Sequence, residues 1–171
     1  MENSEQATGK SLWNGVIRVL FKQAETYEKF NAFLKVKQKA IITGDTKHLK
    51  TLEGEEKSFV STLEQLEDVR RESAIECVGG EAPTLRDLLA GSPQEHRPEL
   101  EDAAVRLMEA INKVVVTHKS NTELLEEAIH FVQFNLNLLT SSGAPTDSTY
   151  GASGRLREAE NKVKGLLNKQ V

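Results

Sequence analysis

A seam of regularly spaced residues between Asp45 and about Val78 constrains the fold of this chain more than any other feature. Its positions step by three and four without a slip: Leu49, Leu52, Glu56, Phe59, Leu63, Leu66 and Arg70. This spacing places one stripe of side chains along an α-helix that packs in a coiled coil. The charged residues at two seam positions are polar breaks in the stripe. The segment therefore predicts a long helix that pairs with another helix.

A second amphipathic segment precedes it, from Ser11 to Thr43, with no proline and one glycine, Gly15. Gly44 can take a positive φ and end this helix, and Asp45 can cap the next one. A short connection between two long helices makes them antiparallel neighbours. The residues expected inside this hairpin are Leu20, Leu34, Leu52, Phe59 and Leu63.

The second half of the chain predicts a short helix and a third long one. Gly79 and Gly80 end the preceding helix, and Thr84 is the expected N-cap of the short helix. The long helix is expected to start near Pro98 and to run to about Leu139. Its seam is interrupted by His118 and Asn121 and otherwise consists of Leu100, Ala104, Leu107, Ile111, Val114, Leu125, Ala128, Val132 and Leu139.

The expected fold class is all-α: an elongated antiparallel helical bundle or coiled coil of three long helices and one short helix, followed by a C-terminal amphipathic helix. No segment has the pattern of a β-strand. The expected organisation comprises a disordered N-terminus (1–10), a helical bundle (11–139), a flexible linker (140–154) and the amphipathic helix (155–171).

The composition excludes several function classes. The formal net charge is −4, which disfavours nucleic-acid binding because phosphate recognition needs clustered Lys and Arg. Cys77 is the one cysteine, so no disulfide framework or cysteine-rich zinc site is expected. No secretory signal and no membrane-spanning apolar run is visible. We therefore expect a cytoplasmic protein with no membrane insertion.

No catalytic motif is present, and we expect neither enzymatic activity nor a cofactor or metal. The sequence lacks nucleotide-binding loops, zinc-protease motifs and nucleophile elbows. The four histidines, His48, His96, His118 and His130, have no partners at metal-ligand spacing. One alternative is a signalling bundle in which His118 accepts a phosphate, but a polar break in the helix seam explains this histidine more simply.

Several motifs resemble those of the FlgN family of flagellar type III export chaperones. They are the helix break in "AIITGDTKHLKTL", the Arg70-Arg71 pair, the short "TLRDLL" helix, the "FVQFNLNLL" stretch and the final "TYGASGR". The last is similar to the family's Y-G-x-x-G signature. The resemblance covers roughly residues 12–155.

This resemblance implies a chaperone that binds the C-terminal helical regions of the first and third hook-associated proteins. It implies that the chaperone prevents their premature assembly and delivers them to the export gate. The partners implied are those cargo proteins, the cytoplasmic domain of the gate and the export ATPase complex. The implied gate-docking residues are Tyr150, Gly151 and Gly154. The alternative is a coiled-coil adaptor with no role in export.

The segment after the Tyr-Gly motif carries the expected cargo-binding stripe. Leu156, Ala159, Val163, Leu166 and Leu167 share one helix face. This stripe can dock on the chain's own bundle or bind an amphipathic cargo helix, and cargo binding is the favoured interpretation. Tyr150 likewise can dock on a partner or pack back on the bundle.

Overall fold

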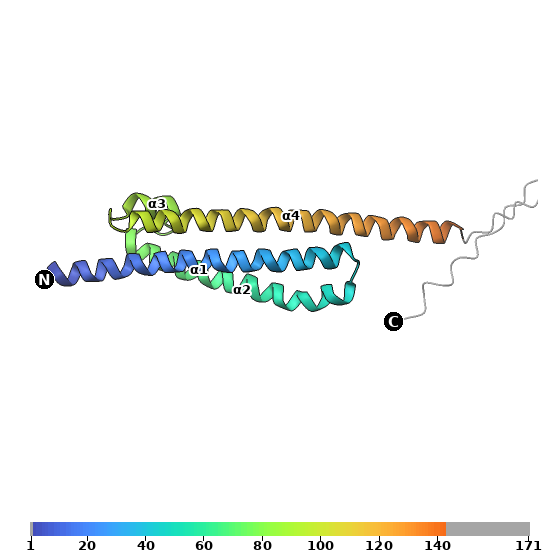
Figure 1. The fold of residues 1–171 in the computed structure, drawn as a ribbon, viewed down its shortest axis with the longest axis horizontal. Helices are drawn as coiled ribbons and strands as arrows, with labels where there is room; N and C mark the ends of the chain where they lie inside the picture. The colour runs from blue at the N-terminus through green and yellow to red at the C-terminus, as the bar shows by residue number, and fades with distance from the viewer. Residues whose placement is uncertain (1, 143–171) are drawn as a thin grey trace, which may run out of the picture. The chain divides into compact units, whose positions relative to one another are not determined.

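Four helices make up the part of the chain that the computed structural model describes, which is residues 2–142, with side chains from 9 to 140 (Figure 1). They are α1 (Glu2–Ile42), α2 (Thr46–Val78), α3 (Leu85–Gly91) and α4 (Arg97–Ser142). Within these residues there is no strand, which confirms the all-α prediction. The expected helix 155–171 lies outside the described residues.

The connection between α1 and α2 has the geometry expected from its sequence. Gly44 has a φ of 65°, a left-handed conformation that glycine adopts at little steric cost. The Asp45 side chain then accepts a hydrogen bond of 2.9 Å from the backbone amide of His48. This N-cap satisfies one of the amides that the first turn of α2 leaves unpaired.

A capping box starts the short helix α3. The Thr84 hydroxyl accepts from the Asp87 amide, and the Asp87 carboxylate accepts from the Thr84 amide at 2.8 Å. The Asp87 carboxylate also accepts from the Thr84 hydroxyl at 2.6 Å, and this hydrogen bond, followed by the one from the Thr84 amide, lowers the pKa of Asp87. The predicted N-cap at Thr84 is thus confirmed, and the reciprocal bonds fix where the chain turns into α3.

Polar contacts define the helix directions. Gln23 of α1 contacts Glu67 of α2, while Lys37 contacts Glu56, so residue numbers rise in opposite directions and the hairpin is antiparallel. Between α1 and α4, by contrast, the residue numbers rise together. Arg106 donates to the Glu28 carboxylate, and Asn121 donates to the backbone carbonyl of Leu34. Helices α1 and α4 therefore run in the same direction, with α2 as the return segment.

Two apolar clusters form the core. One joins all four helices and contains Trp13, Val16, Ile17, Leu20, Ala24, Ala74, Leu88, Leu100, Ala103 and Leu107. The other contains Phe30, Phe33, Leu34, Ala40, Leu52, Leu63 and Val114, with Phe59 packed against it. The residues expected inside the hairpin are buried or, for Phe59, partly buried. The seam therefore faces the core as the spacing predicts.

Both outer helix boundaries differ from the sequence prediction. Helix α1 already begins at Glu2, whereas residues 1–10 were expected to be disordered. Residues 2–10 contain no proline and several residues of good helix propensity, so nothing in them stops the helix. Helix α4 continues to Ser142 instead of ending near Leu139. Thr140 stays in the helix and donates to the carbonyl of Leu136 at 2.9 Å.

The chain divides into two compact units, residues 1–128 and residues 129–171. The first unit holds α1–α3 and most of α4. The second begins with the last turns of α4. Among residues 2–142, no helix is long and apolar enough to cross a membrane.

Candidate functional site

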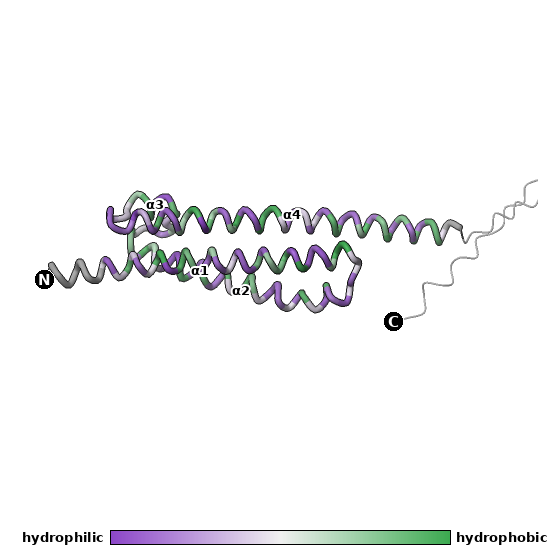
Figure 2. Tube along the Cα trace, in the orientation of Figure 1, coloured by the Kyte–Doolittle hydropathy of each residue, from purple (hydrophilic) through white to green (hydrophobic). Residues whose placement is uncertain are grey.

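The last turns of α4 expose an unusual amount of apolar surface. Seven large apolar side chains between 129 and 139 are more than half exposed: Ile129, Phe131, Val132, Phe134, Leu136, Leu138 and Leu139. No residue from 128 to 142 carries a formal charge. Figure 2 shows the hydrophobic colouring recurring along this part of α4. Contiguous exposed apolar surface of this kind marks an interaction site.

These side chains form two faces on the helix. At about 100° per residue, Ile129, Val132, Leu136 and Leu139 fall on one stripe, which we call the aliphatic stripe. Phe131, Phe134 and Leu138 fall nearly opposite and form the aromatic face. The polar side chains between the two faces are those of His130, Gln133, Asn135 and Asn137. A helix with two apolar faces can contact a partner on either side.

The three-four pattern of α4 includes Val132 and Leu139 and predicts that they belong to the seam of the bundle. In the structure they are 54% and 72% exposed. Their spacing continues that of the buried α4 residues Leu107 and Val114, which is why periodicity alone assigned them to the core. The three-four pattern does not predict the aromatic face. The signal for this face in the sequence is that Phe131 and Phe134 are large apolar residues at positions outside the seam.

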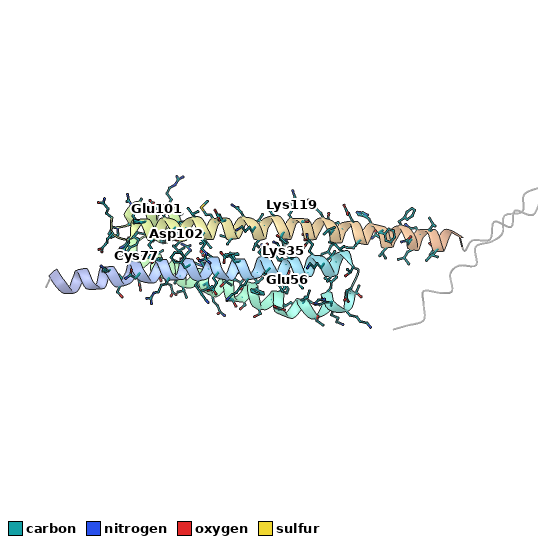
Figure 3. All side chains as sticks on the ribbon, viewed as in Figure 1. Lys35, Glu56, Cys77, Glu101, Asp102 and Lys119 are labelled. Carbon is teal, nitrogen blue, oxygen red and sulfur yellow. The ribbon has the colours of Figure 1, made fainter. Side chains whose placement is uncertain are left out.

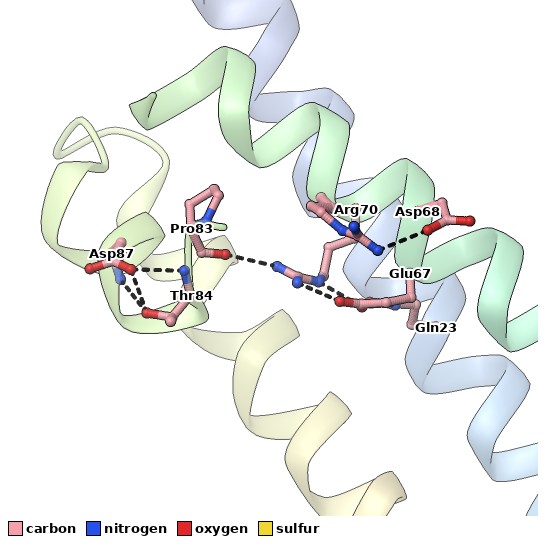
Figure 4. A network of polar contacts seen from close by, with 8 residues as sticks. Gln23, Glu67, Asp68, Arg70, Pro83, Thr84 and Asp87 are labelled. Atoms are coloured by element: carbon pink, nitrogen blue, oxygen red, sulfur yellow. Dashed lines mark hydrogen bonds and ion pairs between the residues drawn. The ribbon is translucent and has the colours of Figure 1, made fainter. Parts of the chain in front are cut away.

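A polar network joins α1, α2 and the start of α3 (Figure 4). The Arg70 guanidinium donates to both Glu67 carboxylate oxygens, at 2.6 and 2.8 Å, and reaches the Pro83 carbonyl at 3.5 Å. Gln23 donates to the same carboxylate at 3.0 Å. The hydrogen bonds from Arg70 and Gln23 lower the pKa of Glu67, against burial. Arg70 thus holds the α2–α3 connection in place, and Arg71 instead pairs with Asp68 on the surface.

A groove of about 660 Å³ lies beside this network, between α1 and α2. Its lining residues are Tyr27, Phe30, Val60, Leu63, Glu64, Glu67, Asp68 and Arg71. Burial, and then the charge of Glu67, raise the pKa of the Tyr27 hydroxyl. Because Glu67 and Asp68 are already paired with arginines, the groove offers apolar contact between ion pairs.

A family model described as FlgN protein matches residues 13–158, which is most of the chain. The chain belongs to the FlgN family. This family is one of flagellar export chaperones rather than enzymes, which implies a role in flagellar export and the binding of hook-associated proteins. No curated protein and no solved structure matches the chain significantly.

The FlgN-family motif residues divide between the two units. The Arg70-Arg71 pair belongs to the ion pairs of the first unit, and "FVQFNLNLL" supplies six of the seven exposed apolar side chains between 129 and 139. The gate-docking and cargo-binding residues predicted from the sequence lie outside the described residues. They are Tyr150, Gly151, Gly154, Leu156, Ala159, Val163, Leu166 and Leu167.

The reactive side chains of the described FlgN-family bundle form no cluster. His118 is exposed on α4, and among the described residues no group of three histidine, cysteine or acidic side chains could hold a metal. Burial, and then the nearby Glu76 carboxylate, raise the pKa of the Cys77 thiol. A raised pKa makes a thiol less reactive at neutral pH.

Proposed function

We propose that this protein is a cytoplasmic chaperone for the first and third hook-associated proteins. It binds the C-terminal helical regions of these cargo proteins, prevents their premature assembly and delivers them to the export gate. The observation that carries the proposal is the uncharged, exposed apolar surface of residues 129–139 in a chain of the FlgN family. A surface of this kind suits amphipathic helices, whether the chain's own segment 155–171 or a helix of a partner, because such helices bind through apolar anchors at helical spacing.

The proposed cargo contact is the apolar stripe of segment 155–171. Leu156, Val163 and Leu166 supply apolar area at three-four spacing, the arrangement by which one helix packs along another. Binding energy that is spent on rearranging this segment is lost from the net affinity, which suits a chaperone that must release its cargo. Ala159 and Leu167 complete the stripe.

The proposed gate contact is Tyr150. A tyrosine ring supplies a large apolar surface with few rotamers to restrict, and its hydroxyl can form a hydrogen bond. Gly151 and Gly154 permit a close approach of backbone to partner. The gate domain, and with it the export ATPase complex, would be reached while segment 155–171 holds cargo.

Calorimetry with the C-terminal region of a hook-associated protein tests the cargo contact. Leu156→Ala, Val163→Ala and Leu166→Ala together should weaken binding by more than about tenfold. The matched control is Glu158→Ala, Asn161→Ala and Asn168→Ala together, on the polar side of the same segment, which should bind like the wild type. Unchanged affinity in the leucine variant would place the cargo site elsewhere.

A titration of the gate domain with the chaperone–cargo complex tests the second contact. Tyr150→Ala should weaken this binding by more than about tenfold, while Tyr150→Phe should keep most of it because the ring remains. Cargo affinity should stay unchanged in both variants. A pull-down that enriches other proteins and no hook-associated proteins would favour the coiled-coil adaptor instead.

A further inference from the structure

The aliphatic stripe of α4 exposes four large apolar side chains to water. Packing another apolar surface against this stripe would therefore be favourable. We propose that the chain's own segment 155–167 packs on this stripe, antiparallel to α4, when no cargo is bound. This inference goes beyond the proposed function, since it concerns the cargo-free chain and holds whichever cargo is bound.

The spacing of the two stripes carries the proposal. Read backwards along α4, the aliphatic stripe steps by three, four and three residues, through Leu139, Leu136, Val132 and Ile129. Read forwards, the later segment takes the same steps through Leu156, Ala159, Val163 and Leu166. The steps three, four and three read the same in both directions, so these four residues can lie opposite the four residues of the aliphatic stripe in either alignment, and other features set the direction. Such a match along the whole length is what knobs-into-holes packing requires.

The charges favour the antiparallel direction. Segment 155–171 contains five basic and two acidic residues, and its basic side chains include Lys162, Lys164 and Lys169 towards its end. The turn of α4 that precedes the aliphatic stripe carries the exposed Glu126 and Glu127. Antiparallel docking brings the basic end towards this acidic turn. Parallel docking would instead direct the basic end towards the uncharged residues up to Ser142.

The connection is long enough. Residues 143–154 can span up to about 40 Å, while two packed helices need an interaxial distance of about 10 Å. A tether of this length holds the two stripes at millimolar effective concentration, of the order of 1 mM. Docking to the same chain is therefore favoured over docking to a second copy at ordinary protein concentrations. The aromatic face, on the other side of α4, stays available.

Disulfide formation in the full-length, cargo-free protein tests the proposal. In a Cys77→Ala background, Ile129→Cys is combined with Leu166→Cys as the facing pair, or with Leu156→Cys as the mismatched pair. The mismatched pair closes the shorter loop, so an undocked segment would join it at least as fast. The docked segment should instead join the facing pair at least about tenfold faster, because a disulfide needs closely placed Cα atoms.

Two further variants separate docking from other causes. Leu136→Asp on the aliphatic stripe should abolish the advantage of the facing pair, whereas Phe134→Asp on the aromatic face should leave it. Circular dichroism checks that both variants fold like the parent. The proposal is wrong if the mismatched pair forms as fast as the facing pair, or if the disulfide joins two chains instead of one. No cargo enters this experiment, so its outcome is independent of whether hook-associated proteins bind.

Discussion

The Lys37 ammonium of α1 lies 2.6 Å from the Glu56 carboxylate of α2 (Glu56 is labelled in Figure 3). Both side chains are largely buried, with 22% and 23% of their surface exposed. Glu56 occupies a seam position that apolar residues would otherwise fill. The ion pair therefore satisfies a charge that the α1–α2 hairpin partly removes from water.

Removing one partner of this pair should destabilise the bundle. Lys37→Met keeps the apolar stem but leaves the Glu56 charge unpaired, so the free energy of unfolding should fall by about 1–2 kcal/mol. The matched control is Lys57→Met, which breaks the exposed pair with Glu53 on the surface of α2 and should cost less than about 0.5 kcal/mol. Urea denaturation measures both. Equal effects would show that burial of the Lys37 pair does not matter.

Gly91 at the end of α3 should not tolerate a side chain. A Cβ atom there would lie 2.7 Å from Cγ1 of Val78, a rigid branched side chain at the end of α2. Gly91→Ala should therefore lower the unfolding free energy by about 1–3 kcal/mol through overpacking.

Gly54 in α2 gives the opposite expectation, since nothing lies within 4 Å of a Cβ at that position. Gly54→Ala should raise the unfolding free energy by about 0.5–1 kcal/mol, because alanine loses less backbone entropy in a helix. Thermal unfolding of the two variants gives the comparison. A stabilised Gly91→Ala protein would contradict the packing of α3 against α2.

Acidification should weaken the contact between Glu67 and Arg70. The pKa of Glu67 is lower in the folded chain than its ordinary value, so this carboxylate stabilises the fold above the pKa of the unfolded state. That contribution is lost as the pH falls from about 5 through the lowered pKa. The stability difference between wild type and Glu67→Gln should therefore shrink on going from pH 7 to acid.

Glu64→Gln provides the control for this titration, because Glu64 is exposed on the same helix. The effect of Glu64→Gln on the free energy of unfolding at pH 7 should be smaller than that of Glu67→Gln. Denaturation midpoints recorded at several pH values decide the matter. If the wild type became more stable relative to Glu67→Gln as the pH fell, the prediction for Glu67 would be wrong.

The Cys77 thiol should react slowly in the native protein. Burial and the nearby Glu76 carboxylate raise its pKa, which lowers the fraction of reactive thiolate at pH 8. A chromogenic disulfide reagent should modify Cys77 at least about tenfold more slowly than free glutathione. Unfolding in urea should remove the difference. Native reaction at the glutathione rate would mean that the thiol is more accessible than the structure indicates.

Cargo affinity should respond to the docking of segment 155–167 on α4. If docking hides the stripe that binds cargo, Leu136→Asp raises the fraction of chains whose stripe is free to bind cargo. The apparent dissociation constant for cargo should then fall in proportion to the rise in that fraction. Phe134→Asp should not have this effect, since it lies on the other face. Calorimetry with the hook-associated region distinguishes the two variants. Unchanged or weaker binding in Leu136→Asp would mean that the two events do not compete.

The sequence by itself determined the helices and most of their ends. Gly44, Asp45 and Thr84 act through local backbone geometry and hydrogen bonds within a few residues, so their roles can be read without knowing the fold. The three-four spacing of Leu52 and Leu63 likewise fixes which side of α2 is buried, because helical geometry sets it.

Only the tertiary structure decided which helices meet and where their burial stops. The pairing of Lys37 with Glu56, and of Gln23 and Arg70 with Glu67, depends on the register between segments far apart in the sequence. Beyond the polar break at His118 and Asn121, the apolar period of α4 resumes in the phase of the buried Val114 and reaches the exposed Val132. Periodicity records only which face of a helix is apolar, whereas burial requires a neighbour at that level, and a neighbour is a property of the folded chain.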